Sequence, residues 1–198
     1  FIVLYTMAAE NIAKVRAALQ GDESGGIGML EFMDSIDMKE QLKAFTITKS
    51  KDILKEVSKA VQTKDLESQV SLSTDQGKII LRIQGNALFQ PGKADLQKEA
   101  RPILDGLIKT TKDYPEYKIN IQGHTDDAPI VSPMFPTNWE LSAARATAVL
   151  RYFLDKGIEP TRLTATGFAD IFPLGSNDTE EGRSQNRRVE LVLEKEKR

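Results

Sequence analysis

Strict alternation of apolar and polar residues in short segments constrains the fold of this 198-residue chain more than any other feature. A two-residue period is typical of β-strands that bury one face and leave the other more polar. The turn Asp75-Gln76-Gly77 separates two such segments and predicts a hairpin. The alternation predicts strands at 70–73, 79–84, 117–122, 163–167 and 189–194.

Two segments with helical periodicity lie between the predicted strands. The first has Leu96, Ala100 and Ile103 on its apolar face, ends near Lys112 and has Pro102 within its first turns, where proline is tolerated. The second has Asn138 as its expected N-cap, runs to about Lys156, and is followed by Gly157 at the position of a C-cap.

The predicted order of elements is β-β-α-β-α-β-β, with a loop at 85–92 and a polar segment at 177–185 that can form one helical turn. This order indicates an α+β sandwich, in which helices pack on one face of a single mixed β-sheet. We assign this domain to residues 67–198 and a helical extension to residues 1–66.

The N-terminal extension, residues 1–66, is predicted to contain an amphipathic helix at 8–19, a glycine-rich linker at 20–28 and a second helix at 50–64. Residues 1–9 are strongly apolar but far shorter than the ~20 residues that cross a bilayer. The residues alone leave two interpretations open: a short buried segment at a domain start, or the end of a transmembrane helix.

Composition and charge argue against several classes of function. The net charge is -2 and the basic residues are spread along the chain, so nucleic acid is not an expected partner. The chain has no Cys, and its only His is His124, so thiol catalysis and paired His or Cys metal ligands are excluded. Asp126 and Asp127 are adjacent and point to opposite sides, so they do not converge on one water. We predict no catalytic residues, no metal site and no cofactor.

The stretch from Gly123 to Ala146 favours a binding site instead. Asp126 ends the third predicted strand, and Arg145 lies on the core-facing stripe of the following helix. A buried unpaired cation is costly, so Arg145 needs an anionic partner. Two possibilities follow: a plain salt bridge with Asp126, or a clamp in which Arg145 binds the carboxylate and Asp126 the ammonium of a zwitterionic ligand.

Two consecutive arginines before the last strand are expected to point in opposite directions. Arg187 has the parity of inward-facing Val189, so it can reach the same end of the sheet as Asp126. Arg188 has the other parity and is expected to be structural. The free helix N-terminus at Asn138 also favours an anionic group nearby.

Four motifs spaced along the second half of the chain carry a family resemblance. They are Gly123-His124-Thr125-Asp126, Asn138-x-x-Leu141-Ser142-x-x-Arg145-Ala146-x-x-Val149, Gly167-Phe168, and Glu181-Gly182-Arg183-x-x-Asn186-Arg187-Arg188-Val189-Glu190. Together they resemble the OmpA-like peptidoglycan-binding domain over about residues 70–194. Phe153 stands where the helix motif usually ends in Leu, which is a core substitution and affects no binding residue.

This resemblance implies a non-enzymatic anchor that binds peptidoglycan. In the family, the residues that match Asp126 and Arg145 hold the diaminopimelate of a stem peptide. The predicted peptidoglycan-binding residues are Asp126, Arg145, Thr125, Asn138, Leu141, Phe89 and Arg187.

Asp127 followed by Pro129, together with Asn138-Trp139-Glu140-Leu141-Ser142, resembles the MotB-type stator subunits of the bacterial flagellar motor. Residues 1–7 resemble the last turns of their membrane helix, and residues 8–19 resemble the plug. The resemblance implies the periplasmic domain of a single-pass inner-membrane protein. It also implies a homodimer, a MotA-type channel subunit as partner, and a linker and plug that couple wall binding to channel activation.

Two alternatives remain beside the stator interpretation. One is a wall anchor of the same domain family in another envelope machine, such as a secretion system or an outer-membrane protein. The other is a wall-processing enzyme, which turnover of muropeptides by the purified chain would reveal.

Overall fold

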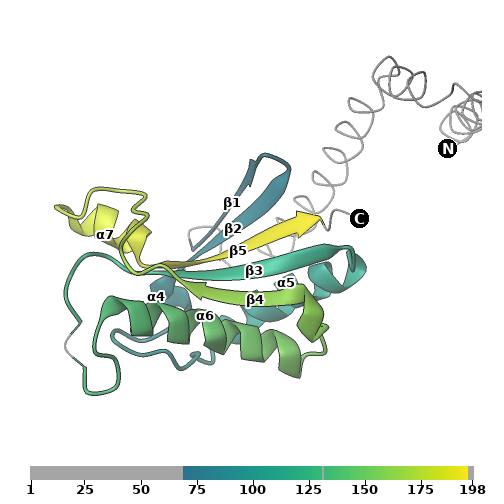
Figure 1. Ribbon diagram of the computed structural model, residues 1–198, viewed down its shortest axis with the longest axis horizontal. Coiled ribbons are helices and arrows are strands. Elements are labelled where there is room, and N and C mark those ends of the chain that lie inside the picture. Colours follow the sequence, from purple (N-terminus) through teal and green to yellow (C-terminus); the bar gives the residue numbers. More distant parts are fainter. Residues whose placement is uncertain (1–68, 131, 196–198) are drawn as a thin grey trace, which may run out of the picture. The chain divides into compact units, whose positions relative to one another are not determined.

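The computed structural model of the protein describes residues 69–130 and 132–195, which form one five-stranded mixed sheet with helices against it (Figure 1). The α+β class and the predicted strands are confirmed. The helices predicted at 8–19 and 50–64, and the linker between them, lie outside the described residues. In chain order the elements are β1 (Val70–Asp75), β2 (Lys78–Gln84), α4 (Gly85–Leu88), α5 (Ala100–Asp113), β3 (Tyr117–His124), α6 (Asn138–Asp155), the short 3-10 helix η1 (Pro160–Arg162), β4 (Leu163–Gly167), α7 (Glu180–Asn186) and β5 (Arg188–Lys195).

The strands lie in the order β1-β2-β5-β3-β4, so the last strand of the chain occupies the centre of the sheet (Figure 1). β5 is antiparallel to both β2 and β3, while β3 and β4 are parallel and are joined through α6. His124 at the end of β3 pairs with Arg188 at the start of β5. This register brings Arg187, the residue before β5, close to Thr125 and Asp126, which follow β3 and belong to the predicted site.

The hydrophobic core lies between the sheet and the helices α5 and α6. The strand side chains in it are those that the alternation predicted to point inward. Phe153 of α6 is completely buried in it. Burial of a side chain of this size stabilises a fold by about 1.5–3 kcal/mol, so this core and not the site residues dominates stability. The strands contribute Ile79, Leu81, Ile83, Tyr117, Ile119, Ile121, Val189, Leu191 and Leu193.

On the central strands, the residues that alternate with the core residues include several charged ones. Glu190 accepts hydrogen bonds from Arg188, at 2.6 Å from its Nε, and from Arg82, at 3.0 Å from its Nε. Arg188 and Glu190 are both almost completely buried. Arg188 is therefore structural, as its parity predicted, because it neutralises a buried carboxylate.

The structure corrects two predicted boundaries. The segment 85–92 is not all loop, because α4 forms one helical turn there and buries Leu88 completely. Helix α5 begins at Ala100, whereas Leu96 pairs with Phe89 in an isolated β-bridge. The short helix predicted in the polar segment is present as α7. None of the helices in the described residues is both long and apolar enough to cross a membrane.

Candidate functional site

A pocket of about 390 Å³ opens where β3 ends, α6 begins and α7 leads into β5. Residues from distant parts of the sequence line it. All seven residues predicted from the sequence are among them: Phe89, Thr125, Asp126, Asn138, Leu141, Arg145 and Arg187. The structure therefore brings the predicted set together on one surface.

The close approach of β3 and α6 depends on Gly123. A Cβ atom at this position would lie 2.1 Å from the carbonyl oxygen of Ser142 on α6, so no side chain fits. The Ser142 hydroxyl in turn accepts a hydrogen bond from the backbone N–H of Ala169. Thr125, just after β3, donates its backbone N–H to the carbonyl oxygen of the same residue, Ala169. These contacts fix Asp126 relative to the helix that carries Arg145.

The N-cap of α6 is Thr137 and not Asn138, so the predicted cap is wrong by one residue. Thr137 has extended backbone angles, and its hydroxyl accepts a hydrogen bond from the N–H of Trp139. Glu140 accepts from the backbone N–H of Thr137 at 2.8 Å, which completes a capping box. Because Thr137 takes the cap, the side chain of Asn138 is available for another contact.

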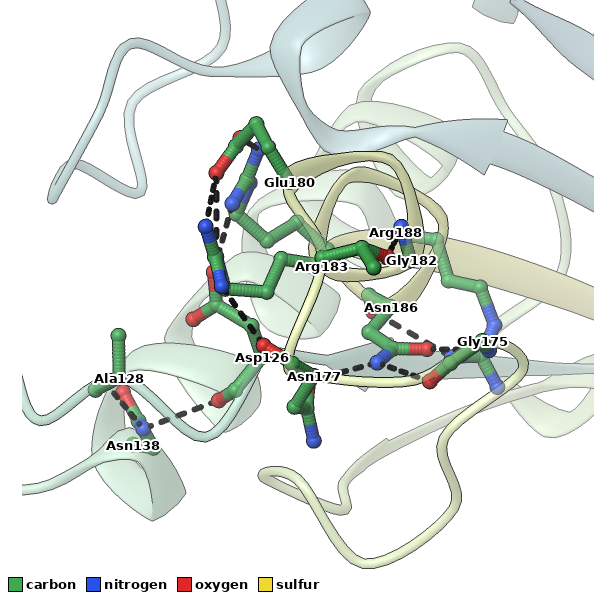
Figure 2. A network of polar contacts seen from close by, with 12 residues as sticks. Asp126, Ala128, Asn138, Gly175, Asn177, Glu180, Gly182, Arg183, Asn186 and Arg188 are labelled. Carbon is green, nitrogen blue, oxygen red and sulfur yellow. Dashed lines mark hydrogen bonds and ion pairs between the residues drawn. The ribbon is translucent and has the colours of Figure 1, made fainter.

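Asn138 ties the loop after β3 to the start of α6. Its side-chain amide donates to the carbonyl oxygens of Asp126 at 3.3 Å and Ala128 at 2.9 Å (Figure 2). These hydrogen bonds connect the loop to the helix at the pocket wall.

Arg145 is almost completely buried, with 6% of its surface exposed. Its Nε donates to the carbonyl oxygen of Lys93 at 2.9 Å, and the guanidinium lies 5.3 Å from the centre of the Phe89 ring. The pKa of Arg145 is lowered to about 10, mainly because the side chain is buried; the charge of Asp126 raises it and the charge of Arg187 lowers it. Arg145 is still a cation at neutral pH, and it is held in place by a neutral acceptor and a ring.

Of the two possibilities for Asp126 and Arg145, the plain salt bridge between them is not formed among the described residues. Asp126 pairs instead with Arg187, whose Nη1 lies 2.6 Å from Oδ2 of the carboxylate. The other end of the Arg187 guanidinium contacts Glu180 on α7, at 2.5 Å from Nη2 to Oε1. Figure 2 shows Asp126 and Glu180 on either side of this link. Arg145 is thus left with no carboxylate partner in the described part of the chain.

The sequence did not single out Glu180, because its position depends on the fold of the segment before β5. Asn186, fully buried, fixes that segment. Its side chain accepts hydrogen bonds from the N–H groups of Leu174 and Gly175, and donates to the carbonyl oxygen of Gly175 and to Asn177 (Figure 2). Asn186 belongs to one of the motifs of the family resemblance, which was the available signal for its role.

The pocket combines charge with apolar walls. Leu141 and Phe89 are buried and present carbon surface, while Thr125 is buried with a hydroxyl that has no hydrogen-bond partner in the described residues. A buried hydroxyl without a partner is unusual, and a ligand in the pocket can supply one. Among residues 69–130 and 132–195, no cluster of His, Asp and Glu is placed to hold a metal ion.

His124 lies on the sheet face away from the pocket wall and stacks on Phe168, with ring centres 5.4 Å apart. It is buried, and neither ring nitrogen has a hydrogen-bond partner in the described part of the protein. Burial lowers the pKa of His124 to about 4, with a smaller lowering by the charge of Arg188. His124 is therefore a neutral packing residue at pH 7.

We expect this histidine to make the fold sensitive to mild acid. Its folded pKa of about 4 lies below the unfolded value of 6.5, so the unfolded chain binds the proton first. The stabilisation is complete above pH 6.5 and is lost as the pH falls from 6.5 towards 4. Between pH 7.5 and 4.5 the wild type should lose roughly 2 kcal/mol more than His124→Phe, which keeps a stacking ring but does not titrate. Urea unfolding of both proteins at the two pH values measures this, and equal losses would contradict it.

A model of the OmpA family matches residues 88–187, which is half of the chain and includes every predicted site residue. The chain belongs to the OmpA family. Motility protein B of Bacillus subtilis (strain 168) is 29% identical to it over 98% of this chain and 84% of the relative. These findings, with the solved structures that follow, group the chain with the MotB-like OmpA-domain proteins.

Solved structures of other proteins share this fold. A MotB-like protein from Desulfovibrio vulgaris is 39% identical and superposes with a TM-score of 0.73, over 78% of this chain and 99% of its own. The cell wall anchor of the type VI secretion system from Pseudomonas aeruginosa is 28% identical, with a TM-score of 0.65, over 71% of this chain and 97% of its own. The OmpA-family fold thus accounts for the arrangement of β3, α6 and β5 that builds the pocket.

Proposed function

We propose that this chain is the peptidoglycan-binding part of a flagellar stator B subunit and anchors the torque-generating unit to the cell wall. The observation that carries the proposal is the pocket, in which Arg145 and Asp126 stand on two rigid elements. These opposite charges match the zwitterionic end of diaminopimelate in a stem peptide. The similarity to a motility protein and to a cell wall anchor supports both parts of the proposal.

In this proposal the two charged residues have distinct roles. Arg145 binds the ligand carboxylate, because its guanidinium is a cation without a carboxylate partner in the described residues. Asp126 binds the ligand ammonium, and Arg187 acts through Asp126 by holding its carboxylate in place. Fixing both charges before binding reduces the cost of ordering the site.

The remaining predicted residues shape the pocket around the ligand. Phe89 and Leu141 supply the apolar walls against which the ligand's methylene groups pack. The free hydroxyl of Thr125 makes a hydrogen bond to the ligand, and Asn138 contributes by fixing the loop after β3. Every one of these roles is binding or positioning, so we propose an anchor and not an enzyme.

A series of stem peptides tests the zwitterion receptor directly. We expect the purified chain to bind a peptide ending in diaminopimelate at least about tenfold more tightly than one ending in lysine, which lacks the second carboxylate. Acetylation of the side-chain amine should cause a loss of similar size. Isothermal titration calorimetry measures both.

Two neighbouring carboxylates provide a matched control for this series. Asp126→Asn should remove most of the preference for the free amine, whereas Asp127→Asn should leave it unchanged, because Asp127 is exposed and does not line the pocket. Equal affinity of the wild type for all the peptides would refute the proposed ligand.

The stator assignment includes partners that only the full-length protein can have. We propose a homodimer in the periplasm, attached to a single membrane helix and assembled with a MotA-type channel subunit. In this proposal residues 8–19 act as a plug and the linker couples its release to wall binding. Residues 8–19 lie outside the described residues, so the plug stays a prediction from the sequence.

A wall anchor of another envelope machine is the second candidate, and the likeness to the Pseudomonas aeruginosa anchor favours it. Both candidates use the same pocket, so peptide binding does not separate them. Deletion of residues 8–19 in a full-length protein does, because an ion leak and slow growth follow only if the segment plugs a channel.

A further inference from the structure

The structure assigns a second anion-binding position to this pocket, at Arg187, where Glu180 is the anion in contact. We propose that a further carboxylate of the ligand displaces Glu180 from Arg187 when the zwitterionic end binds. This inference rests on the proposed function and specifies its ligand class as acidic peptides. Glu180 then sets how strongly the site selects for that extra charge.

The Arg187 guanidinium is held at one edge. Its Nη1 is held by Asp126, whose side chain is only 12% exposed. This contact keeps the guanidinium in the pocket wall and turns its second edge, with Nη2, towards Glu180. An arginine fixed at one edge presents the other as a ready donor for an anion.

The contact between Arg187 and Glu180 is exposed to solvent on the Glu180 side. The Glu180 side chain is 67% exposed, and ion pairs of such exposed groups contribute little. Glu180 also bonds to Arg183, whose Nε lies 3.0 Å from Oε2, so it keeps a partner after leaving Arg187 (Figure 2). The pKa of the Glu180 carboxyl is lowered, first by Arg187 and then by Arg183, so it is ionised when the ligand arrives. Glu180 is thus a weakly held anion that a ligand can replace.

The charges that line the pocket are balanced. Its charged lining residues within the described part of the chain are Asp126, Glu180, Arg145 and Arg187, which sum to zero. A zwitterion brings no net charge, so the balance holds only while Glu180 stays. If Glu180 leaves, the pocket gains a positive charge that a second ligand carboxylate can neutralise. The position therefore suits a ligand with one carboxylate more than a simple amino-acid end.

Two forms of one stem tripeptide, alanyl-isoglutamyl-diaminopimelate, test the inference. In one form all carboxylates are free, and in the other the carboxylates outside the zwitterionic end are amidated. The wild type should bind the free form about tenfold more tightly than the amidated form. The ratio of the two dissociation constants is the readout, because a general loss of fold or affinity does not change it.

Variants then separate the role of each residue. Glu180→Gln should raise the ratio about threefold by removing the competing anion, while Glu181→Gln should not change it. Glu181 is the matched control because it is also exposed and lies beside Glu180 on α7 but outside the pocket lining. Arg187→Gln should reduce the ratio to near one, even if it weakens both peptides.

The outcomes distinguish this inference from the proposed function. A wild type that binds neither peptide overturns both. A wild type that binds the two forms equally, or a Glu180→Gln variant with a lower ratio, overturns the second anion position and leaves the zwitterion receptor standing. Thermal unfolding of each variant confirms that it is folded before its ratio is compared.

Discussion

Replacing Arg145 by alanine is expected to weaken binding of a diaminopimelate stem peptide on the order of a hundredfold. The reason is that Arg145 is buried and positioned before the ligand arrives, by the carbonyl of Lys93 and the ring of Phe89. Removal of one partner from a buried, hydrogen-bonded charge pair also leaves the ligand carboxylate desolvated and unpaired. Titration calorimetry with the peptide, and pull-down with peptidoglycan, measure the loss.

The fold should survive this change. Arg145→Ala loses one hydrogen bond and some packing on Phe89, which costs about 1–2 kcal/mol, whereas Val149 and Phe153 still anchor α6 in the core. Arg151→Ala is the matched control, since Arg151 is exposed on the same helix and lies outside the pocket. Peptide affinity of Arg145→Ala within a factor of about three of the Arg151→Ala value would remove Arg145 from the site.

Alanine at position 123 is expected to destabilise the fold by about 3 kcal/mol or more and to abolish peptide binding. The new Cβ would lie 2.1 Å from the carbonyl oxygen of Ser142 and 2.9 Å from its carbonyl carbon, both in the helix backbone. A backbone cannot turn aside as a flexible side chain can, so α6 must shift away from β3. Because Asp126 follows β3 and Arg145 lies on α6, this shift also separates the two charges of the receptor.

The control for this glycine is Gly157, after the end of α6. Its φ is +84° and no atom lies within 4 Å of a Cβ built there, so Gly157→Ala carries only a conformational cost of about 1–2 kcal/mol. Urea unfolding gives both free energies. If the two variants lose equal stability, the contact between Gly123 and Ser142 does not limit how β3 and α6 pack.

Local patterns were sufficient to predict the elements and the inward faces. The alternation of Ile79, Leu81 and Ile83 identified which side chains enter the core, because strand side chains alternate whatever the neighbouring strand is. The start of α6 was predicted to within one residue. Thr137 and Asn138 are both good caps, and the choice between them depends on a backbone conformation that composition does not reveal.

Part of the pocket was predictable from the residues themselves, since Asp126 ends a strand and Arg145 lies on the inner stripe of the next helix. The full set of seven followed from the family resemblance, and all seven line the pocket. Glu180 was missed because nothing local distinguishes it from its neighbour Glu181. Only the fold of the segment pinned by Asn186 turns Glu180, and not Glu181, towards the pocket.

The sequence by itself determined which charges this protein carries to the pocket, and the tertiary structure decided how they pair. The sequence left open a direct pairing of Asp126 with Arg145, 19 positions away on the next helix, yet the partner of Asp126 is Arg187, 61 residues further along the chain. That pairing exists because β5 enters the sheet beside β3, an order that strand periodicity cannot specify. The same arrangement leaves Arg145 on the carbonyl of Lys93, a neutral acceptor that does not cancel its charge. A long-range strand order thus makes Arg145 available to a ligand, because it gives the nearby carboxylate a different arginine.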